Sequence, residues 1–322
     1  MKGEQLNTKW EQISASNIVK GYKSLRINAS CYSDIYLAID EQDNHCLILI
    51  LPIDYELKFK VIKKDKISLE YFSDKNYVVM TLLDNEFNGL FYDLILSIYN
   101  AIKDIEKVEV YSKVFIQTFH QWVLFFSPEY STKLSKDIIK GIFGELIVLR
   151  ELVLSSGWRD INETLLGWVG PYDQTHDFVY LDKNIEVKTK DDKQVSVRIS
   201  SEHQLTIEEG KKLIMSVVSV SEDLINGASL KMLVKELKVL TFEMFGDFSI
   251  VLKALYQKGL TLQNVSCYDN YRFKAMSLTD FDCSNEGFPK ITLANLPPNI
   301  ANVTYDLNIS KMSKFKIQVR EL

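Results

Sequence analysis

The spacing of apolar residues changes along this chain, and the changes divide it into parts with different expected structures. Up to about residue 85, short runs such as "LKFKVIKKDKISLEYF" alternate apolar and polar residues, which is typical of strands. From there apolar residues recur every four positions, from Leu90 to Ile102, which predicts a helix. A β-rich first part is therefore expected to pass into helices.

Two more helices are predicted before strands return. The first is "VYSKVFIQTFHQWVLFFSP", which we expect Pro128 to end, and the second is "STKLSKDIIKGIFGELIVLRELVLSSGW", which begins with a Ser or Thr cap. We expect a domain boundary at this point. Residues 1–130 would form an N-terminal β-rich domain with trailing helices, and residues 131–322 a second domain.

The second domain is expected to mix helices and strands. Its strand candidates are "HDFVYLD", "NIEVKTKD", "QVSVRIS" and "KLIMSVVSV", and "SSEHQLTIEEG" between the last two is a polar turn or a short helix. A helical stretch with a break near Gly246 follows, and the tail is expected to form strands separated by a Pro-rich turn. The predicted order is helix, three strands, short helix and strand.

Composition excludes several classes of protein. The net charge of −5 gives no support to a protein that simply coats DNA, which would usually be basic. The four cysteines are scattered without a CxxC pair, so a cysteine zinc site is not expected. The N-terminus has no apolar signal region, and the longest apolar run, "CLILILP", is too short for a membrane helix. We therefore expect a cytoplasmic protein without membrane contact.

Three charged residues lie on two neighbouring strand candidates. Asp177 begins the first, while Glu186 and Lys188 are two residues apart on the second and so share one face, with Val187 on the other. Clustered carboxylates repel each other unless a cation neutralises them, and Mg²⁺ prefers carboxylate oxygens, water and phosphate. The spacing predicts a Mg²⁺ site, with Mn²⁺ as a substitute, in which Asp177, Glu186 and the Val187 carbonyl are ligands.

Lys188 would then orient or deprotonate the attacking water, or stabilise the charge of the transition state. The Glu-x-Lys pattern alone is weak, because it also occurs at Glu56, Glu209 and Glu236. A solvated sheet face with an ordinary charge pair explains the same spacing, and that alternative stays open. The Asp nine residues before Glu186, the helical Glu145 upstream and the strand downstream favour the metal site.

A longer set of motifs resembles a known family. "GIFGELIVLREL", "GWVGPYDQTHDFVY", "IEVKTK" and "VRISSEHQL" together resemble the PD-(D/E)XK nuclease superfamily, and more particularly a bacterial family of PD-(D/E)XK proteins found near restriction-modification and phage-defence genes. The resemblance implies an α/β fold with a restriction-endonuclease-like core, α-β-β-β-α-β with a mixed sheet, after an N-terminal mainly β domain.

The resemblance also implies roles for individual residues. Asp177, Glu186 and Lys188 would be catalytic, Glu145 would be the helix carboxylate that assists metal binding, and Gln204 the polar residue that some members add after the third strand. His176 stands where the motif has Pro, and we expect a loop residue without a catalytic role.

Further residues have weaker assignments. The basic residues around the carboxylates are either a solvated face or phosphate contacts; they are Lys183, Lys190, Lys193 and Arg198. We expect Trp168, Gly170 and Pro171 to shape the loop that leads into the site. Gly141 and Gly144 predict close packing of their helix against a strand.

The function implied is a Mg²⁺-dependent endonuclease that hydrolyses DNA phosphodiester bonds in restriction or phage defence. Its partners would be DNA and either a second copy of the chain, as a homodimer, or partner subunits of a defence system. One alternative is a catalytically weak DNA-binding or assembly subunit of a defence complex, which the acidic net charge favours. Another is a metal-dependent phosphoesterase that acts on RNA or small nucleotides.

Overall fold

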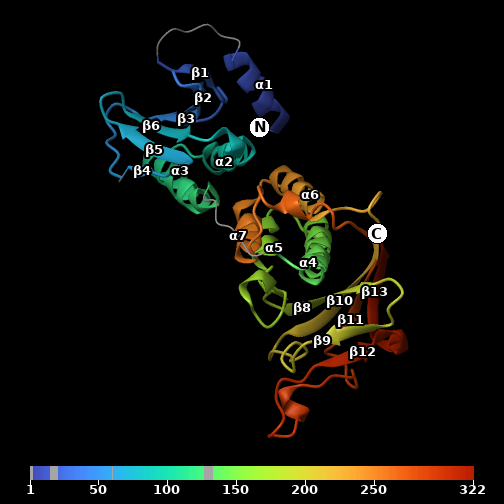
Figure 1. The fold of residues 1–322 in the computed structure, drawn as a ribbon. Helices are drawn as coiled ribbons and strands as arrows, with labels where there is room; N and C mark the ends of the chain where they lie inside the picture. The colour runs from blue at the N-terminus through green and yellow to red at the C-terminus, as the bar shows by residue number, and fades with distance from the viewer. Residues whose placement is uncertain (1–2, 15–20, 60, 127–132) are drawn as a thin grey trace. The chain divides into compact units, whose positions relative to one another are not determined.

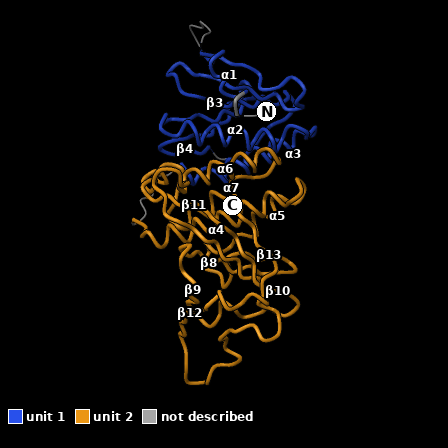
Figure 2. The backbone as a smooth tube through the Cα atoms, turned by 90° about the vertical axis from the view of Figure 1, so that its right-hand side faces the viewer, with its two compact units in different colours: residues 1–129 blue, residues 130–322 orange. Residues whose placement is uncertain are grey.

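The computed structural model describes residues 3–14, 21–59, 61–126 and 133–322. They form two compact units, residues 1–129 and residues 130–322, which Figure 2 shows in different colours. Pro128 and the cap candidates Ser131 and Thr132 lie outside the described residues. No helix in the described ranges has both the length and the apolar character needed to cross a membrane.

Unit 1 is built on a six-stranded antiparallel sheet with the order β1-β2-β3-β6-β5-β4 (Figure 1). The strands are β1 (Lys23–Arg26), β2 (Asp34–Ile39), β3 (His45–Ile50), β4 (Ile62–Lys63), β5 (Ile67–Phe72) and β6 (Tyr77–Leu82). The helices are α1 (Gly3–Ser14), η1 (Asn85–Phe87), α2 (Asn88–Ile102), α3 (Val108–Trp122) and η2 (Val123–Phe126). The predicted passage from strands to helices is present.

One predicted strand of unit 1 is mostly absent. In "LKFKVIKKDKISLEYF" only Ile62–Lys63 and Ile67–Phe72 are strands, and no strand covers residues 55–59. The Asn76 side chain donates to the carbonyls of Pro52 and Tyr55, which precede this stretch. These bonds hold the chain in a turn just before the stretch, and the alternation of apolar residues alone could not reveal this.

Unit 2 contains a five-stranded mixed sheet with the order β13-β11-β10-β8-β7. Its strands are β7 (Phe178–Val179), β8 (Lys183–Asp191), β10 (Lys212–Glu222), β11 (Phe273–Asp282) and β13 (Lys316–Glu321). β8 and β10 are parallel, whereas the other neighbours are antiparallel. The α/β class with a mixed sheet and an N-terminal mainly β region is therefore confirmed.

Helices and a small second sheet cover opposite faces of the five-stranded sheet (Figure 1). The helices are α4 (Lys136–Ser155), α5 (Ile161–Leu166), α6 (Leu230–Glu243) and α7 (Ser249–Gln257), with η3 (Gly170–Tyr172) and η4 (Val265–Tyr268) between them. Phe143 of α4 packs on Phe273 of β11, with 5.2 Å between ring centroids. On the other face Met215 and Val217 join a buried apolar cluster with Val197 and Leu307.

The small second sheet differs from the expected core. β9 (Ser196–Ile199) pairs with β12 (Tyr305–Asn308) rather than with the five-stranded sheet. Residues 200–211, all described, form turns, so the short helix expected between β9 and β10 is absent there. The buried Glu202 carboxylate accepts the N–H groups of Asn302 and Val303, which holds the C-terminal segment beside β9. The remaining elements are η5 (Leu293–Asn295), η6 (Ile309–Lys311) and η7 (Ser313–Phe315).

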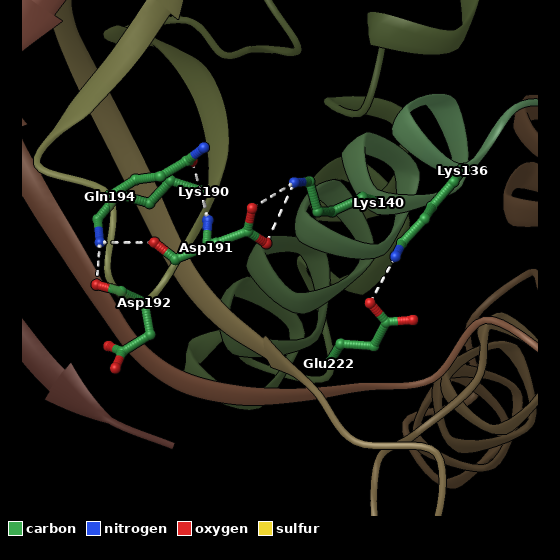
Figure 3. A network of polar contacts seen from close by, with 7 residues as sticks. All are labelled: Lys136, Lys140, Lys190, Asp191, Asp192, Gln194 and Glu222. Atoms are coloured by element: carbon green, nitrogen blue, oxygen red, sulfur yellow. Dashed lines mark hydrogen bonds and ion pairs between the residues drawn. The ribbon is translucent and has the colours of Figure 1, made fainter.

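The start of α4 is fixed to the strand ends by charged groups (Figure 3). Ser135 caps the helix, since its hydroxyl accepts the Ile138 N–H. Lys140 donates to both carboxylate oxygens of Asp191 at 3.2 Å, and Lys136 pairs with Glu222 at the end of β10. These pairs join α4 to both parallel strands.

Gly144 lets α4 approach β8 closely. A methyl group at this position would meet the Thr189 hydroxyl and lie 3.0 Å from Thr189 Cβ, whereas a methyl group at Gly141 would meet nothing within 4 Å. We expect Gly144→Ala to lower the free energy of unfolding by about 1–3 kcal/mol through overpacking. Gly141→Ala, the matched control, should raise it by up to about 1 kcal/mol through helix propensity.

Chemical denaturation of both variants tests this expectation. The double variant Gly144→Ala with Thr189→Ala should recover much of the lost stability, because it removes the group that the new methyl meets. Equal stability of the two glycine variants would show that α4 does not depend on this close contact.

Candidate functional site

Asp177 lies immediately before β7, at the edge of the sheet. β7 is short and pairs with β8 only at Phe178–Ile185 and Val179–Asn184, so beyond Ile185 no strand among the described residues covers this edge of β8. Asp177 occupies that edge: its Oδ2 accepts the Val187 N–H at 2.7 Å, and its own carbonyl accepts the Gly170 N–H at 2.8 Å. The aspartate is thereby fixed to β8 on one side and to the loop at η3 on the other.

Glu186 and Lys188 share a face of β8, as their spacing predicts. The Lys188 ammonium donates to Glu186 Oε1 at 2.8 Å and to Gln204 Oε1 at 2.9 Å. Gln204 Oε1 also accepts the Ser200 N–H, which fixes the amide in the turn after β9. Glu186 is only 2 % exposed, so its carboxylate is held against the lysine beneath this turn.

Glu145 approaches Asp177 from α4, near Gly170. The buried indole of Trp168 donates from Nε1 to Glu145 Oε2 at 2.7 Å and fixes the direction of the carboxylate. A Cβ atom at Gly170 would lie 2.7 Å from Asp177 Oδ1 and 3.0 Å from Glu145 Oε2. Two carboxylate oxygens from different elements therefore converge on one point, and only a residue without a side chain leaves that point open.

Burial and mutual repulsion dominate the electrostatics of the three carboxylates. Burial and the neighbouring Asp177 raise the pKa of Glu145 to about 8 and that of Glu186 to about 8. Burial also raises the pKa of Asp177, against the opposing effects of the Val187 N–H and Lys188. Without further positive charge, the chain holds Glu145 and Glu186 mostly protonated at neutral pH.

This arrangement predicts a pH-dependent stability in the presence of a chelator. The folded pKa values of Glu145 and Glu186, about 8, lie above the 4.5 of an unperturbed glutamate, so the folded chain retains protons that the unfolded chain has released. The free energy of unfolding that these two groups contribute should be fully present below pH 4.5 and should be lost as the pH rises through about 8.

Thermal unfolding between about pH 5 and about pH 8.5 measures this slope. A variant carrying both Glu145→Gln and Glu186→Gln should lose most of it, because neither amide titrates. The interpretation would be wrong if the wild type and this variant showed the same slope.

The donor set suits a hard divalent cation. Carboxylate oxygens are its preferred ligands, and a cation would remove the repulsion that raises these pKa values. In an extended strand the N–H and C=O of one residue point to the same edge, so the Val187 carbonyl points to the edge that Asp177 occupies. As the side chains stand, no three His, Cys, Asp or Glu groups among the described residues form a metal-binding arrangement, since Glu186 is paired with Lys188.

The chain matches a known protein family. The family model described as "Putative PD-(D/E)XK family member, (DUF4420)" matches residues 6–310. The chain belongs to this family. No curated protein and no solved structure matches the chain. The matched range includes most of both units and all of the residues that converge at the edge of β8.

The basic residues predicted around the carboxylates are dispersed. Lys190 is buried, and its ammonium donates to the carbonyls of Asp191 and Asp192 (Figure 3). It therefore stabilises the turn after β8 and does not point to a phosphate. Lys183 lies over the Tyr180 ring, 5.8 Å from its centroid. Lys193 and Arg198 are exposed beyond β8 and on β9. The lysines whose charges lower the pKa values of Glu145 and Asp177 are instead Lys188 and Lys258.

Two further residues of this part of unit 2 are His176 and Lys258. His176 is buried and lies beside the Asn184 amide, with Nδ1 3.3 Å from Asn184 Nδ2. Lys258 follows α7, and its charge lowers the pKa values of Glu145 and Asp177. The sequence analysis missed it, because a Lys followed by Gly259 is also the ordinary end of a helix.

Proposed function

We propose that this protein is a metal-dependent endonuclease that hydrolyses DNA phosphodiester bonds. The observation that carries the proposal is the convergence of Asp177 Oδ1 and Glu145 Oε2 on the open point at Gly170, at the edge of the strand that carries Glu186 and Lys188. One buried carboxylate, Glu186, with two partly buried ones close by is costly to a fold that makes no use of them.

Asp177, Glu186 and the Val187 carbonyl would hold Mg²⁺ or Mn²⁺, with Glu145 as the additional carboxylate. The ion would supply charge neutralisation at the phosphate and a water of lowered pKa. The elements that hold these groups are rigid, because Trp168 fixes Glu145 and the Val187 N–H fixes Asp177. Preorganised ligands of this kind cost no reorganisation during the reaction.

Lys188 acts as the fixed cation of the strand. An ammonium has three donors, and the contacts with Glu186 and Gln204 use two of them. The third donor is available to the attacking water or to a non-bridging phosphate oxygen, where it orients the water and stabilises the charge that develops. Gln204 accepts from both Lys188 and the Ser200 N–H, so it positions the ammonium rather than taking part in bond making.

A cleavage assay tests the proposal. Supercoiled and linear DNA, unmodified and methylated, are incubated with the purified chain and Mg²⁺, Mn²⁺ or a chelator. We expect nicking or cutting only with a divalent cation, and none with Asp177→Asn. Metal binding by calorimetry without any DNA cleavage, but with cleavage of RNA or small nucleotides, would assign a different phosphoesterase. Neither cleavage nor metal binding would leave a DNA-binding or assembly subunit. We further propose restriction or phage defence as the setting of the DNA-cutting activity.

A further inference from the structure

A second lysine approaches the carboxylates from the helical side of unit 2. Lys258 follows α7, and α7 packs against η3, whose first residue is Gly170. Lys258 Nζ lies 3.0 Å from Asp173 Oδ1, and Asp173 is the residue that ends η3. The lysine is therefore attached to the same short segment that lies against Asp177 and Glu145.

The two lysines reach the carboxylates from different elements. Lys188 comes from β8, on the sheet face opposite α4, whereas Lys258 comes from the end of α7. The charges of both lysines lower the pKa values of Glu145 and Asp177. A phosphate that enters between these elements would meet positive charge on two sides.

The partner that Lys258 has in this structure holds it weakly. The Asp173 side chain is 92 % exposed, whereas that of Lys258 is 28 % exposed. A pair with one fully solvated member contributes little, so the ammonium can exchange to another anion. A phosphate oxygen is a strong acceptor for such a charge-assisted hydrogen bond.

We infer that Lys258 binds a backbone phosphate of the nucleic acid at this site and leaves Asp173 when it does so. The inference rests on the proposed function for its substrate, and it adds to that function a binding residue from outside the strand motif. Asp173 has a left-handed backbone, with φ 55°, which Asn also tolerates, so Asp173→Asn removes the competing charge without changing the turn.

Binding of duplex DNA, measured by fluorescence anisotropy over a range of salt concentrations, tests the inference. The background is Asp177→Asn, which prevents cleavage. Lys258→Met should weaken binding about tenfold at low salt and reduce the slope of log K against log salt by about one, the value for one lost phosphate contact. Lys258→Arg should keep the slope, and Asp173→Asn should tighten binding. Lys253→Met, on the same helix, is the matched control and should leave the slope unchanged.

The outcomes separate this inference from the proposed function. If the wild-type chain cleaves DNA but Lys258→Met has the same salt slope as its background, the inference is overturned and the proposed function is not. An equal loss in Lys253→Met, or a lower melting temperature of Lys258→Met with an unchanged slope, would overturn it in favour of general charge or structural support. A chain that neither cuts nor binds DNA would overturn both.

Discussion

Asp177→Asn should abolish metal-dependent cleavage while leaving the fold at least as stable as before. The amide keeps the shape of the side chain and an oxygen that can accept the Val187 N–H, but it removes the charge that faces Glu145. Loss of a ligand worth several kcal/mol of transition-state stabilisation corresponds to a fall in cleavage rate of at least about a thousandfold. Because Asp177 raises the pKa values of Glu145 and Glu186, its neutralisation should also relieve repulsion at neutral pH.

The two effects are measured on the same preparation, as single-turnover cleavage with Mg²⁺ and as thermal unfolding in a chelator. A folded variant with normal cleavage would remove Asp177 from the reaction. A variant that loses activity and also melts well below the wild type would show only that Asp177 supports the fold. The expected combination, lost activity with an equal or higher melting temperature, distinguishes a functional carboxylate from a structural one.

Gly170→Ala should also strongly reduce the rate of metal-dependent cleavage, although it changes no charged group. The new methyl would lie 2.7 Å from Asp177 Oδ1 and 3.1 Å from Asp177 Cα, so the backbone there or the carboxylate must move. It would also fill the point on which Asp177 and Glu145 converge. Displacement of reacting groups by about 1 Å costs on the order of a hundredfold in rate, and we expect a loss of that size in cleavage and a comparable loss in Mn²⁺ affinity.

Calorimetry with Mn²⁺ and the cleavage assay measure both losses. Gly141→Ala is the control, because the same methyl addition there meets nothing within 4 Å. If Gly170→Ala bound Mn²⁺ and cut DNA like Gly141→Ala, the space between the two carboxylates would have no part in the activity.

The parts of this site that follow from local spacing were predictable. The alternation of side chains along one strand puts Glu186 and Lys188 on one face, and the short turn before β8 brings Asp177 back to its edge. The resemblance to a family, rather than spacing, singled out Gln204, and its contact with Lys188 is visible only in the structure. In each case the residues concerned lie on consecutive elements of the chain.

The remaining parts depend on tertiary contacts that have no local signal. Lys190 looked like a phosphate contact, but its ammonium ends on two carbonyls of its own turn. β9 was expected to be the next strand of the main sheet, but it pairs with β12. The segment before β12, about 100 residues later in the chain, is held beside β9 by Glu202. Lys258 had the pattern of a helix end, and only the packing of α7 against η3 brings it to the carboxylates.

The pairing of β9 with β12 has a consequence for how the chain folds during its synthesis. Gln204, which holds Lys188, lies in the turn that begins at Glu202, and the Glu202 carboxylate accepts the N–H groups of Asn302 and Val303. On the ribosome, all three carboxylates and Lys188 emerge long before those partners do. The contacts that hold this turn to the later segment can therefore form only after residues 302 and 303 have been made, and this delay separates the synthesis of the charged residues on β8 from the assembly of their surroundings.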